Sequence, residues 1–500
     1  MGANMKNINL EALSLKKFES AKANVDKKEY HFEKSVEPEI ISFDEVFDKL
    51  DLKDGMTVSF HHHLRNGDYV LNMVMEKLHE RGLKNIKIAA SSIFACHAPL
   101  VEMIEDGTVT DIETSYMSGP VAEAVSKGKL KNPVFITTHG GRPRSIYEGD
   151  LEIDVAFVAS PSVDKKGALD GSTGKSACGS LGYAVADCMC AKKVVAITDN
   201  FIDECENPDV KKGFVDYIVE VDQIGDPSGI VSGTTQVTKD PLGLKIARLT
   251  ATLIDELGYI KDGFSMQTGA GGISLAVASE VKDLMKEKEV KGSFGSGGIT
   301  GFFVEMLEDG LFESLEDVQC FDIEAVKSSK RNKNHHKISG SKYANPNDDC
   351  VAEKLDCVIL GASEIDKNFN INVTTGSDGI ILGGSGGHAD TATGAKLTII
   401  TTKLFNARVS AIVDEVRTIT TPGEVVDVLV TDYGIAINPK RTDLIETLKD
   451  TNLEIKTIDE LYDIAISLTG KPKKRDKSDE IIGFSVYRDG TILDTISKVE

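Results

Sequence analysis

The stretch Val101-Glu-Met-Ile-Glu-Asp-Gly107 occurs a second time in the chain, as Val304-Glu-Met-Leu-Glu-Asp-Gly310. Two further pairs of segments match at nearly the same offset, and they begin at Asp154 and Asp356 and at Lys193 and Lys396. Collinear matches at a near-constant offset of 202 or 203 residues indicate a tandem duplication. A chain of 500 residues is long enough for each copy to be a domain with its own core.

Short β-rich runs alternate with amphipathic helices in each copy. In the first copy, residues 68–81 place four apolar side chains on one helical face. Five apolar runs are typical of strands buried on both faces, and they cover residues 56–60, 86–90, 134–138, 155–159 and 194–198. The alternation predicts an α/β fold of two tandem duplicated domains, each a mostly parallel sheet flanked by helices.

The repeats also predict where the domains begin and end. A linker-like, glycine-rich stretch covers residues 225–235. Residues 328–350 are long and polar, and we find no counterpart for them in the first copy, which suggests a functional loop. We therefore expect an N-terminal arm, a first domain, and a second domain with a C-terminal extension, over residues 1–45, 46–230 and 231–500.

The overall charge excludes several kinds of partner. There are 57 basic and 79 acidic residues, a net charge of −22, so the surface repels nucleic acid and anionic membranes. No apolar run reaches the roughly 20 residues that span a bilayer, and the N-terminus lacks a signal-peptide pattern. The eight cysteines show no disulfide-framework spacing. We expect a cytoplasmic protein with reduced thiols and with neither a nucleic-acid nor a membrane partner.

Four glycine-rich segments of the second copy lie next to predicted strands or helices, at residues 269–272, 292–301, 361–363 and 383–388. Glycine lets a ligand approach the backbone closely, and consecutive N–H groups can hold a phosphate or an oxyanion. Tight strand–helix turns also need glycine, but four such segments in one half favour a backbone-lined site.

Two polar loops follow predicted strands in the first copy. His61, His62 and His63 are consecutive, and adjacent strand residues point to opposite faces, so they do not favour a single metal ion; we expect no metal site. The segment His139-Gly-Gly-Arg-Pro-Arg144 brings two guanidinium groups near backbone N–H groups, which suits a polycarboxylate. Two solvated surface arginines are the alternative. Neither an ATP nor an NAD fingerprint is complete.

Five segments carry a resemblance: Ser59-Phe-His-His-His-Leu-Arg-Asn-Gly-Asp68, Thr137-Thr-His-Gly-Gly-Arg-Pro-Arg144, Ile153-Asp-Val-Ala-Phe157, Leu169-Asp-Gly-Ser-Thr-Gly-Lys-Ser-Ala-Cys-Gly179 and Ser341-Lys-Tyr-Ala-Asn-Pro346. The chain resembles the citrate lyase alpha-chain family nearly from end to end. It is more remotely similar to the CoA-transferase and acetyl-CoA hydrolase superfamily, whose glycine motif resembles Gly384-Ser-Gly-Gly-His-Ala-Asp390.

This resemblance implies two CoA-transferase-like domains and a transferase that exchanges acetate for citrate on an acetyl thioester, giving a citryl thioester and acetate. It implies no permanently bound cofactor; acetyl-CoA or the phosphopantetheine-type arm of an acyl-carrier protein is the substrate. The implied partners are citrate and the beta and gamma (acyl-carrier) chains of an oligomeric citrate lyase complex. We expect citrate at Arg65, His139, Arg142 and Arg144, and the thioester at Gly361, Gly384, Gly386, Gly387 and His388.

One position departs from the superfamily. Many CoA-transferases attack the thioester with a glutamate, and alignment on the segment Gly298-Ile-Thr-Gly301 places Ser296 there. A serine without a base is a poor nucleophile, so we expect no covalent acyl-enzyme and an oxyanion held near Ser296, Gly297 and Gly298. Glu364 is the remaining carboxylate nucleophile, for a covalent CoA-transferase or a thioester hydrolase. A non-catalytic assembly subunit is a further alternative.

Overall fold

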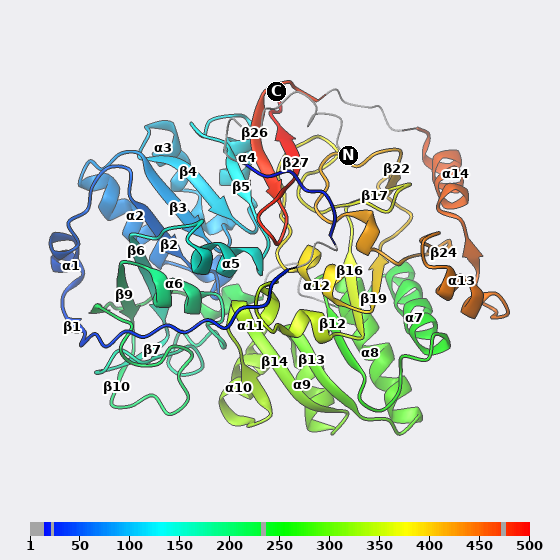
Figure 1. The fold of residues 1–500 in the computed structure, drawn as a ribbon, viewed down its shortest axis with the longest axis horizontal. Coiled ribbons are helices and arrows are strands. Elements are labelled where there is room, and N and C mark those ends of the chain that lie inside the picture. The colour runs from blue at the N-terminus through cyan, green and yellow to red at the C-terminus, as the bar shows by residue number, and fades with distance from the viewer. Residues whose placement is uncertain (1–14, 22–24, 232–236, 472–476) are drawn as a thin grey trace.

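The computed structural model describes residues 15–21, 25–231, 237–471 and 477–500. Figure 1 shows two large α/β halves that lie side by side, the first drawn in blue to teal and the second in green to orange. Each half is built around a large sheet with helices packed against it. Among the described residues, no helix is long and apolar enough to cross a membrane.

The first half contains a ten-stranded sheet. Its strands are, in spatial order, β1 (Glu39–Ile40), β11 (Tyr217–Glu220), β9 (Lys193–Thr198), β6 (Val155–Ser160), β2 (Thr57–Phe60), β3 (Ile86–Ala90), β4 (Val109–Thr114), β5 (Val134–Ile136), β26 (Ile481–Val486) and β27 (Ile492–Ser497). Its helices are α1 (Phe43–Lys49), α2 (Val70–Glu80), α3 (Leu100–Glu105), α4 (Pro120–Ser126), α5 (Gly141–Glu148) and α6 (Ala184–Cys190).

The second half contains a nine-stranded sheet. Its strands are, in spatial order, β15 (His335–Lys337), β14 (Phe312–Cys320), β13 (Gly292–Ile299), β12 (Ser265–Thr268), β16 (Cys357–Gly361), β19 (Leu397–Thr401), β23 (Val428–Thr431), β24 (Gly434–Ile437) and β25 (Ile455–Lys456). Its helices are α7 (Pro241–Glu256), α8 (Gly272–Glu287), α9 (Gly301–Glu308), α10 (Ile323–Arg331), α11 (Gly340–Ala344), α12 (His388–Gly394), α13 (Thr442–Leu448) and α14 (Ile458–Thr469).

Three small sheets lie beside the large ones. They contain β10 (Phe201–Ile202), β7 (Ser162–Asp164) and β8 (Leu169–Asp170); β18 (Ile371–Asn372), β17 (Glu364–Asp366) and β22 (Ile412–Val413); and β20 (Phe405–Asn406) and β21 (Val409–Ser410).

The strand order confirms the predicted duplication. The run β11-β9-β6-β2-β3-β4-β5 and the run β23-β19-β16-β12-β13-β14-β15 have the same connectivity, and every pairing within them is parallel. Asp154 and Asp356 occupy equivalent positions. The Asp154 carboxylate accepts a hydrogen bond from the backbone N–H of Thr57 at 2.8 Å, and that of Asp356 accepts one from Ser265 at 3.0 Å.

The polar segment 328–350 is not an insertion, contrary to our expectation. It contains β15 and α11, which correspond in order to β5 and α5 of the first half. Strand β15 has only three residues and forms the edge of its sheet, so it needs no apolar run to be stable there. The side chain of Lys337 in this segment is 5% exposed and reaches into the first half, where it pairs with Asp170 and Asp209 at 2.9 Å each.

Both ends of the described chain cross between the halves. The C-terminal hairpin β26–β27 joins the first sheet, because β26 pairs in parallel with β5. The N-terminal arm runs along the molecule, shown in dark blue in Figure 1. Its Phe18 backbone bonds to Ile492, Lys28 bonds to Asn347 of the second half, and β1 pairs with β11.

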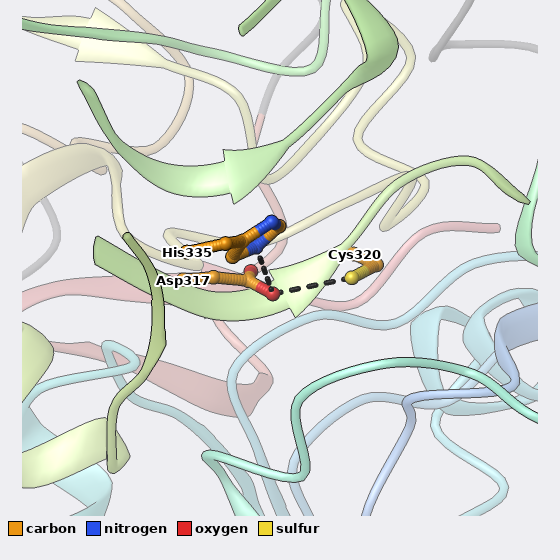
Figure 2. Close-up of side chains that lie close together, drawn as sticks. All are labelled: Asp317, Cys320 and His335. Carbon is orange, nitrogen blue, oxygen red and sulfur yellow. Dashed lines mark hydrogen bonds and ion pairs between the residues drawn. The ribbon is translucent and has the colours of Figure 1, made fainter. Parts of the chain in front are cut away.

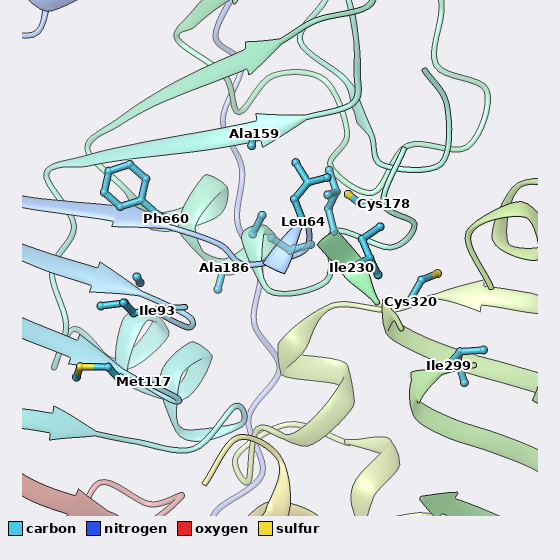
Figure 3. Close-up of a cluster of buried hydrophobic side chains, with 14 of the residues drawn as sticks. Phe60, Leu64, Ile93, Met117, Ala159, Cys178, Ala186, Ile230, Ile299 and Cys320 are labelled. Atoms are coloured by element: carbon cyan, nitrogen blue, oxygen red, sulfur yellow. The ribbon is translucent and has the colours of Figure 1, made fainter. Parts of the chain in front are cut away.

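One large hydrophobic cluster extends through both halves. Figure 3 shows it passing from Phe60 and Ala159 of the first half, through Leu64 and Ile230, to Cys320 and Ile299 of the second. Burial of this surface stabilises the contact between the halves as well as each half. The ends of strands that meet at this contact are therefore held in a defined arrangement.

Candidate functional site

A glycine loop of the second half lies against the strand ends of the first half. Gly386 forms an isolated parallel bridge with Thr138, and its carbonyl accepts a hydrogen bond from the His139 N–H at 2.8 Å. The Gly386 N–H donates to the Ser115 carbonyl at 3.0 Å. We call the contact region around this loop and these strand ends the seam. In parallel sheets, sites form at the carboxyl ends of strands, which is where β4 and β5 meet this loop.

Asp390, on helix α12 of the second half, forms hydrogen bonds to the first half across the seam. Its carboxylate accepts hydrogen bonds from the Thr138 hydroxyl and from the Gly140 N–H, both at 2.8 Å. The side chain is fully buried, and burial raises the pKa of Asp390 to about 6. The Arg488 guanidinium lies 3.6 Å away and opposes this rise.

Three aromatic rings of the first half stack at the seam. The His139 ring lies 5.3 Å from His62 and 4.3 Å from Tyr183, measured between ring centroids. All three side chains are buried or nearly so. Burial lowers the pKa of His139 to about 3, so this imidazole is neutral at physiological pH. It can donate or accept one hydrogen bond, but it cannot supply a positive charge.

The second half contributes polar groups from the ends of β12 and β13. The Gln267 amide donates to the Tyr343 hydroxyl at 2.8 Å, and a Cβ on Gly387 would lie 2.4 Å from that hydroxyl. The buried polar atoms that have no hydrogen-bond partner within the described part of the chain include four at or just beyond strand ends: His139 Nδ1, Gln267 Oε1, Thr268 Oγ1 and Thr300 Oγ1. Buried polar groups are normally paired, so these atoms, at strand ends of both halves, indicate a site for a polar ligand.

Arg65, one of the residues predicted to bind citrate, contacts both halves. Its guanidinium carbon lies 5.2 Å from the ring centroids of both Phe94, in the first half, and Phe321, in the second. The residue is buried and adopts a positive φ of 53°.

The other two predicted arginines have structural partners. The buried Arg142 guanidinium forms a two-pronged ion pair with Asp187, at 2.7 and 2.8 Å, and donates to the Ala89 carbonyl. Arg144 pairs with the exposed Asp150 at 2.8 Å. The segment that we expected to be a loop is the start of helix α5, and both arginines lie on this helix. Each guanidinium pairs with a carboxylate of the first half, so the geometry favours a structural role for Arg142 and Arg144.

Most of the glycine-rich segment 292–301 is strand β13 (Gly292–Ile299) and not a loop. Its glycines allow neighbouring side chains to pack against the backbone, since a Cβ on Gly295 or Gly298 would lie 2.5 or 2.1 Å from a phenylalanine ring. Gly297 has φ 100° and faces Gln267. The buried Ser296 hydroxyl donates to the Glu316 carbonyl at 3.0 Å. This position offers no exposed nucleophile.

Glu364 lies at the start of β17, in a separate polar cluster. Its carboxylate accepts hydrogen bonds from the Asn372 amide at 2.9 Å and from the Arg417 N–H at 3.2 Å. The side chain is 7% exposed. These bonds hold the Glu364 carboxyl group in a fixed orientation.

The predicted thioester residues Gly361 and His388 are in contact. The His388 imidazole lies 2.9 Å from the Gly361 carbonyl and 2.8 Å from the Thr421 hydroxyl. Burial lowers the pKa of His388 to about 4, which leaves it neutral. Gly384 packs against the first half, because a Cβ there would lie 2.4 Å from the Ser115 carbonyl. Of the predicted thioester glycines, Gly384, Gly386 and Gly387 therefore line the seam.

Residue patterns alone did not single out Asp390, Gln267, Tyr183 or Tyr343. Asp390 and Tyr343 belong to segments that carried the family resemblance, and this resemblance was the one feature of the sequence that could have pointed to them. Gln267 and Tyr183 stand in ordinary strand and helix surroundings, and only the contact between the halves brings them to the seam.

The chain matches the family described as citrate lyase, alpha subunit (CitF), over residues 39–499. It is 47% identical to the citrate lyase alpha chain of Haemophilus influenzae over 461 residues, 92% of each chain. It is 45% identical to the citrate lyase alpha chain of Escherichia coli over 480 residues, which cover 95% of this chain and 94% of that one.

Solved structures give the same likeness. A Streptococcus mutans structure described as an alpha subunit of citrate lyase in complex with citrate matches with a TM-score of 0.94 and 44% identity, covering 99% of both chains. The alpha subunit of a malonate decarboxylase from Acinetobacter baumannii matches with a TM-score of 0.62, over 88% of this chain and 96% of that one. At 14% identity, that second match shows a shared fold alone.

Proposed function

Because the chain belongs to the citrate lyase alpha-subunit family, we propose that it exchanges acetate for citrate on an acetyl thioester without forming a covalent acyl-enzyme. The products are a citryl thioester and free acetate. The family's citrate CoA-transferase activity is the premise. The order of bond changes described below, in which no covalent acyl-enzyme forms, is the proposal.

The seam is the proposed place of exchange. The observation that carries this assignment is the set of buried polar atoms on His139, Gln267, Thr268 and Thr300 that no described residue satisfies. A ligand rich in carboxylate and hydroxyl oxygens, such as citrate, can both donate to and accept from such groups. The Streptococcus mutans relative was solved in complex with citrate, which supports citrate as the ligand.

The chemistry needs no nucleophile from the protein. A citrate carboxylate attacks the thioester carbonyl, the C–S bond breaks, and the thiolate leaves a mixed anhydride of citrate and acetate. The thiolate then attacks the citryl carbonyl, the C–O bond breaks, and acetate leaves. Holding both substrates together supplies the effective concentration for each step.

Each tetrahedral intermediate carries an oxyanion that the site must stabilise. We place the donors at the backbone around Gly387, near the neutral His139, because the Gly386 N–H is already bonded to the Ser115 carbonyl. One well-placed donor contributes about 3 kcal/mol to such a transition state. Arg65 supplies positive charge beside the seam, and an arginine stays protonated even when buried.

Two features oppose a covalent route. The Ser296 hydroxyl is buried and committed to the Glu316 carbonyl. The Glu364 carboxylate accepts hydrogen bonds from the Asn372 amide and from the Arg417 N–H, which fix its orientation and oppose its movement toward a thioester. A covalent transferase or a hydrolase that uses Glu364, and a non-catalytic subunit, are the alternatives that the experiment must separate.

We further propose that the chain works in a cytoplasmic citrate lyase complex with beta and acyl-carrier gamma chains. The thioester is then carried by a phosphopantetheine-type arm or, in the assay, by acetyl-CoA. No permanently bound cofactor takes part in this scheme.

The test is to incubate the protein with acetyl-CoA and citrate, and to follow citryl-CoA, acetate and the intact protein mass. We expect both products in equal amounts, an unchanged protein mass with acetyl-CoA alone, and intersecting double-reciprocal lines. Glu364→Gln should keep most of the transfer activity. A mass gain on Glu364 would support the covalent route, acetate without citryl-CoA would support hydrolysis, and no product with either CoA or a carrier protein would support a non-catalytic subunit.

A further inference from the structure

Asp317, Cys320 and His335 form a cluster inside the second half (Figure 2). Asp317 and Cys320 lie on β14, His335 lies on the neighbouring β15, and all three are buried. One Asp317 carboxylate oxygen lies 3.1 Å from both the Cys320 sulfur and the His335 Nε2. One potential ligand atom from each residue lies within 4.8 Å of the other two.

Two further features distinguish this cluster from a set of ordinary hydrogen bonds: an unpaired carboxylate oxygen and a hydrogen bond to the other side of the histidine ring. The second carboxylate oxygen of Asp317, Oδ1, is buried and has no hydrogen-bond partner in the described ranges. The other ring nitrogen of His335, Nδ1, lies 3.0 Å from the Ser328 hydroxyl. Histidines that bind metals are usually oriented by such a partner on the free nitrogen.

We propose that Asp317, Cys320 and His335 bind one zinc ion. Thiolate, imidazole and carboxylate are the ligands that Zn²⁺ takes in proteins. If Asp317 binds through both oxygens, the three side chains supply four donor atoms, and the unpaired Oδ1 gains a partner. The charges also balance, because Zn²⁺ is neutralised by one thiolate and one carboxylate. Binding releases the thiol proton of Cys320 to solvent.

The position of the cluster makes the role structural. A zinc ion there would link β14 to the edge strand β15, which has only three residues. Gln319, next to Cys320, donates to the His62 carbonyl of the first half at 3.2 Å. Cys320 itself packs on the first half, since a Cβ on Gly179 would lie 2.1 Å from its sulfur. The ion would therefore brace the wall of the seam without contacting the reacting groups.

Sequence spacing does not reveal this site. His335 follows Cys320 by 15 residues, and the chain between them contains helix α10. The parallel pairing of β14 with β15 brings the three side chains together.

The test uses the full chain, freed of metal with a chelator and then titrated with Zn²⁺ or Co²⁺. We expect about one metal per chain by elemental analysis, a thiolate-to-Co²⁺ absorption band, and a higher midpoint of thermal unfolding with Zn²⁺. Cys320→Ser should lose the absorption band, whereas Cys357→Ser, an equally buried cysteine of the same half, should keep it.

A milder pair of variants guards against misfolding. Ser328→Ala removes the partner of His335 and should weaken zinc affinity about 10- to 100-fold. Ser329→Ala is the matched control, because its hydroxyl bonds to the Val326 carbonyl and not to the cluster. Absence of stoichiometric metal and of the absorption band in the unaltered protein would overturn the proposal, as would equal zinc affinity of the two serine variants.

Discussion

The Asp390 carboxylate of α12 accepts a hydrogen bond from the Thr138 hydroxyl at 2.8 Å, so a helix of the second half is attached to a strand end of the first. The same carboxylate binds the Gly140 N–H, in the loop that carries His139. The geometry of the seam therefore depends on a buried acid whose charge changes near physiological pH.

The first prediction concerns this acid. Burial raises the pKa of Asp390 to about 6, above its value in the unfolded chain. The stability that it contributes is therefore full below about pH 4 and is lost as the pH rises through about 6. For this group alone, the loss between about pH 5.5 and 7.5 is roughly 1 kcal/mol.

The measurement is urea unfolding of the wild type and of Asp390→Asn across that pH range. The difference between the two free energies of unfolding should change by this amount, with the wild type relatively more stable at the lower pH. A difference that is constant with pH would contradict the assignment.

The second prediction separates two arginines that the sequence presents alike. Arg142→Ala leaves the Asp187 carboxylate buried and unpaired, and should lower the free energy of unfolding by about 3–5 kcal/mol. Arg144→Ala removes an ion pair to the exposed Asp150 and should cost less than about 1 kcal/mol. Chemical denaturation measures both. Equal losses in the two variants would show that the ion pair with Asp187 is not the cause.

The third prediction tests the close approach of Gly387 to the seam. Gly387→Ala places a methyl group 2.4 Å from the Tyr343 hydroxyl, and that buried ring must move. We expect the rate of acyl transfer to fall about tenfold or more, because small displacements at a reacting centre are costly.

The double variant Gly387→Ala with Tyr343→Phe lacks the hydroxyl that the new methyl group would contact, so it should recover part of the lost rate of acyl transfer. Gly271→Ala is the matched control, since the nearest atom to its new Cβ lies at 3.8 Å. No recovery in the double variant would argue against the steric cause.

The fourth prediction concerns Ser296. Its hydroxyl donates to a backbone carbonyl inside the sheet, so Ser296→Ala removes one hydrogen bond worth roughly 1 kcal/mol of stability. The transfer rate should stay within about threefold of the wild type, since no step uses this oxygen. A rate loss of a hundredfold or more, with stability retained, would give Ser296 a chemical role.

Sequence reasoning succeeded where burial imposes a pattern. Strands such as β6 and β9 are buried on both faces, so their apolar runs were visible, and the repeats they belong to predicted the duplicated sheets. It failed at β15, a short edge strand whose polar residues resemble a loop. At β13 the sequence did not show that two of the glycines, Gly295 and Gly298, let phenylalanine rings pack against the strand.

The candidate site was predicted less completely than the fold, because it depends on contacts between distant segments. His139 and the glycines at 386 and 387 stand out in sequence because of their loops, and the structure places them at the seam. The pairing of Arg142 with Asp187 joins residues 45 positions apart, and no periodic pattern indicates such a partner. The same holds for Gln267 and Tyr343, which meet only in the folded chain.

The C-terminal hairpin has a consequence for how the protein is made. Strand β5 pairs with β26, which the ribosome delivers roughly 350 residues later. At about 5–20 residues per second, the newly made first half waits for tens of seconds with the edge of β5 unpaired. Such an open edge is a template for pairing with other chains. The nascent chain must therefore avoid pairing with other chains during this interval. Either a chaperone covers the edge of β5, or aggregation in the cell is slower than the synthesis of β26.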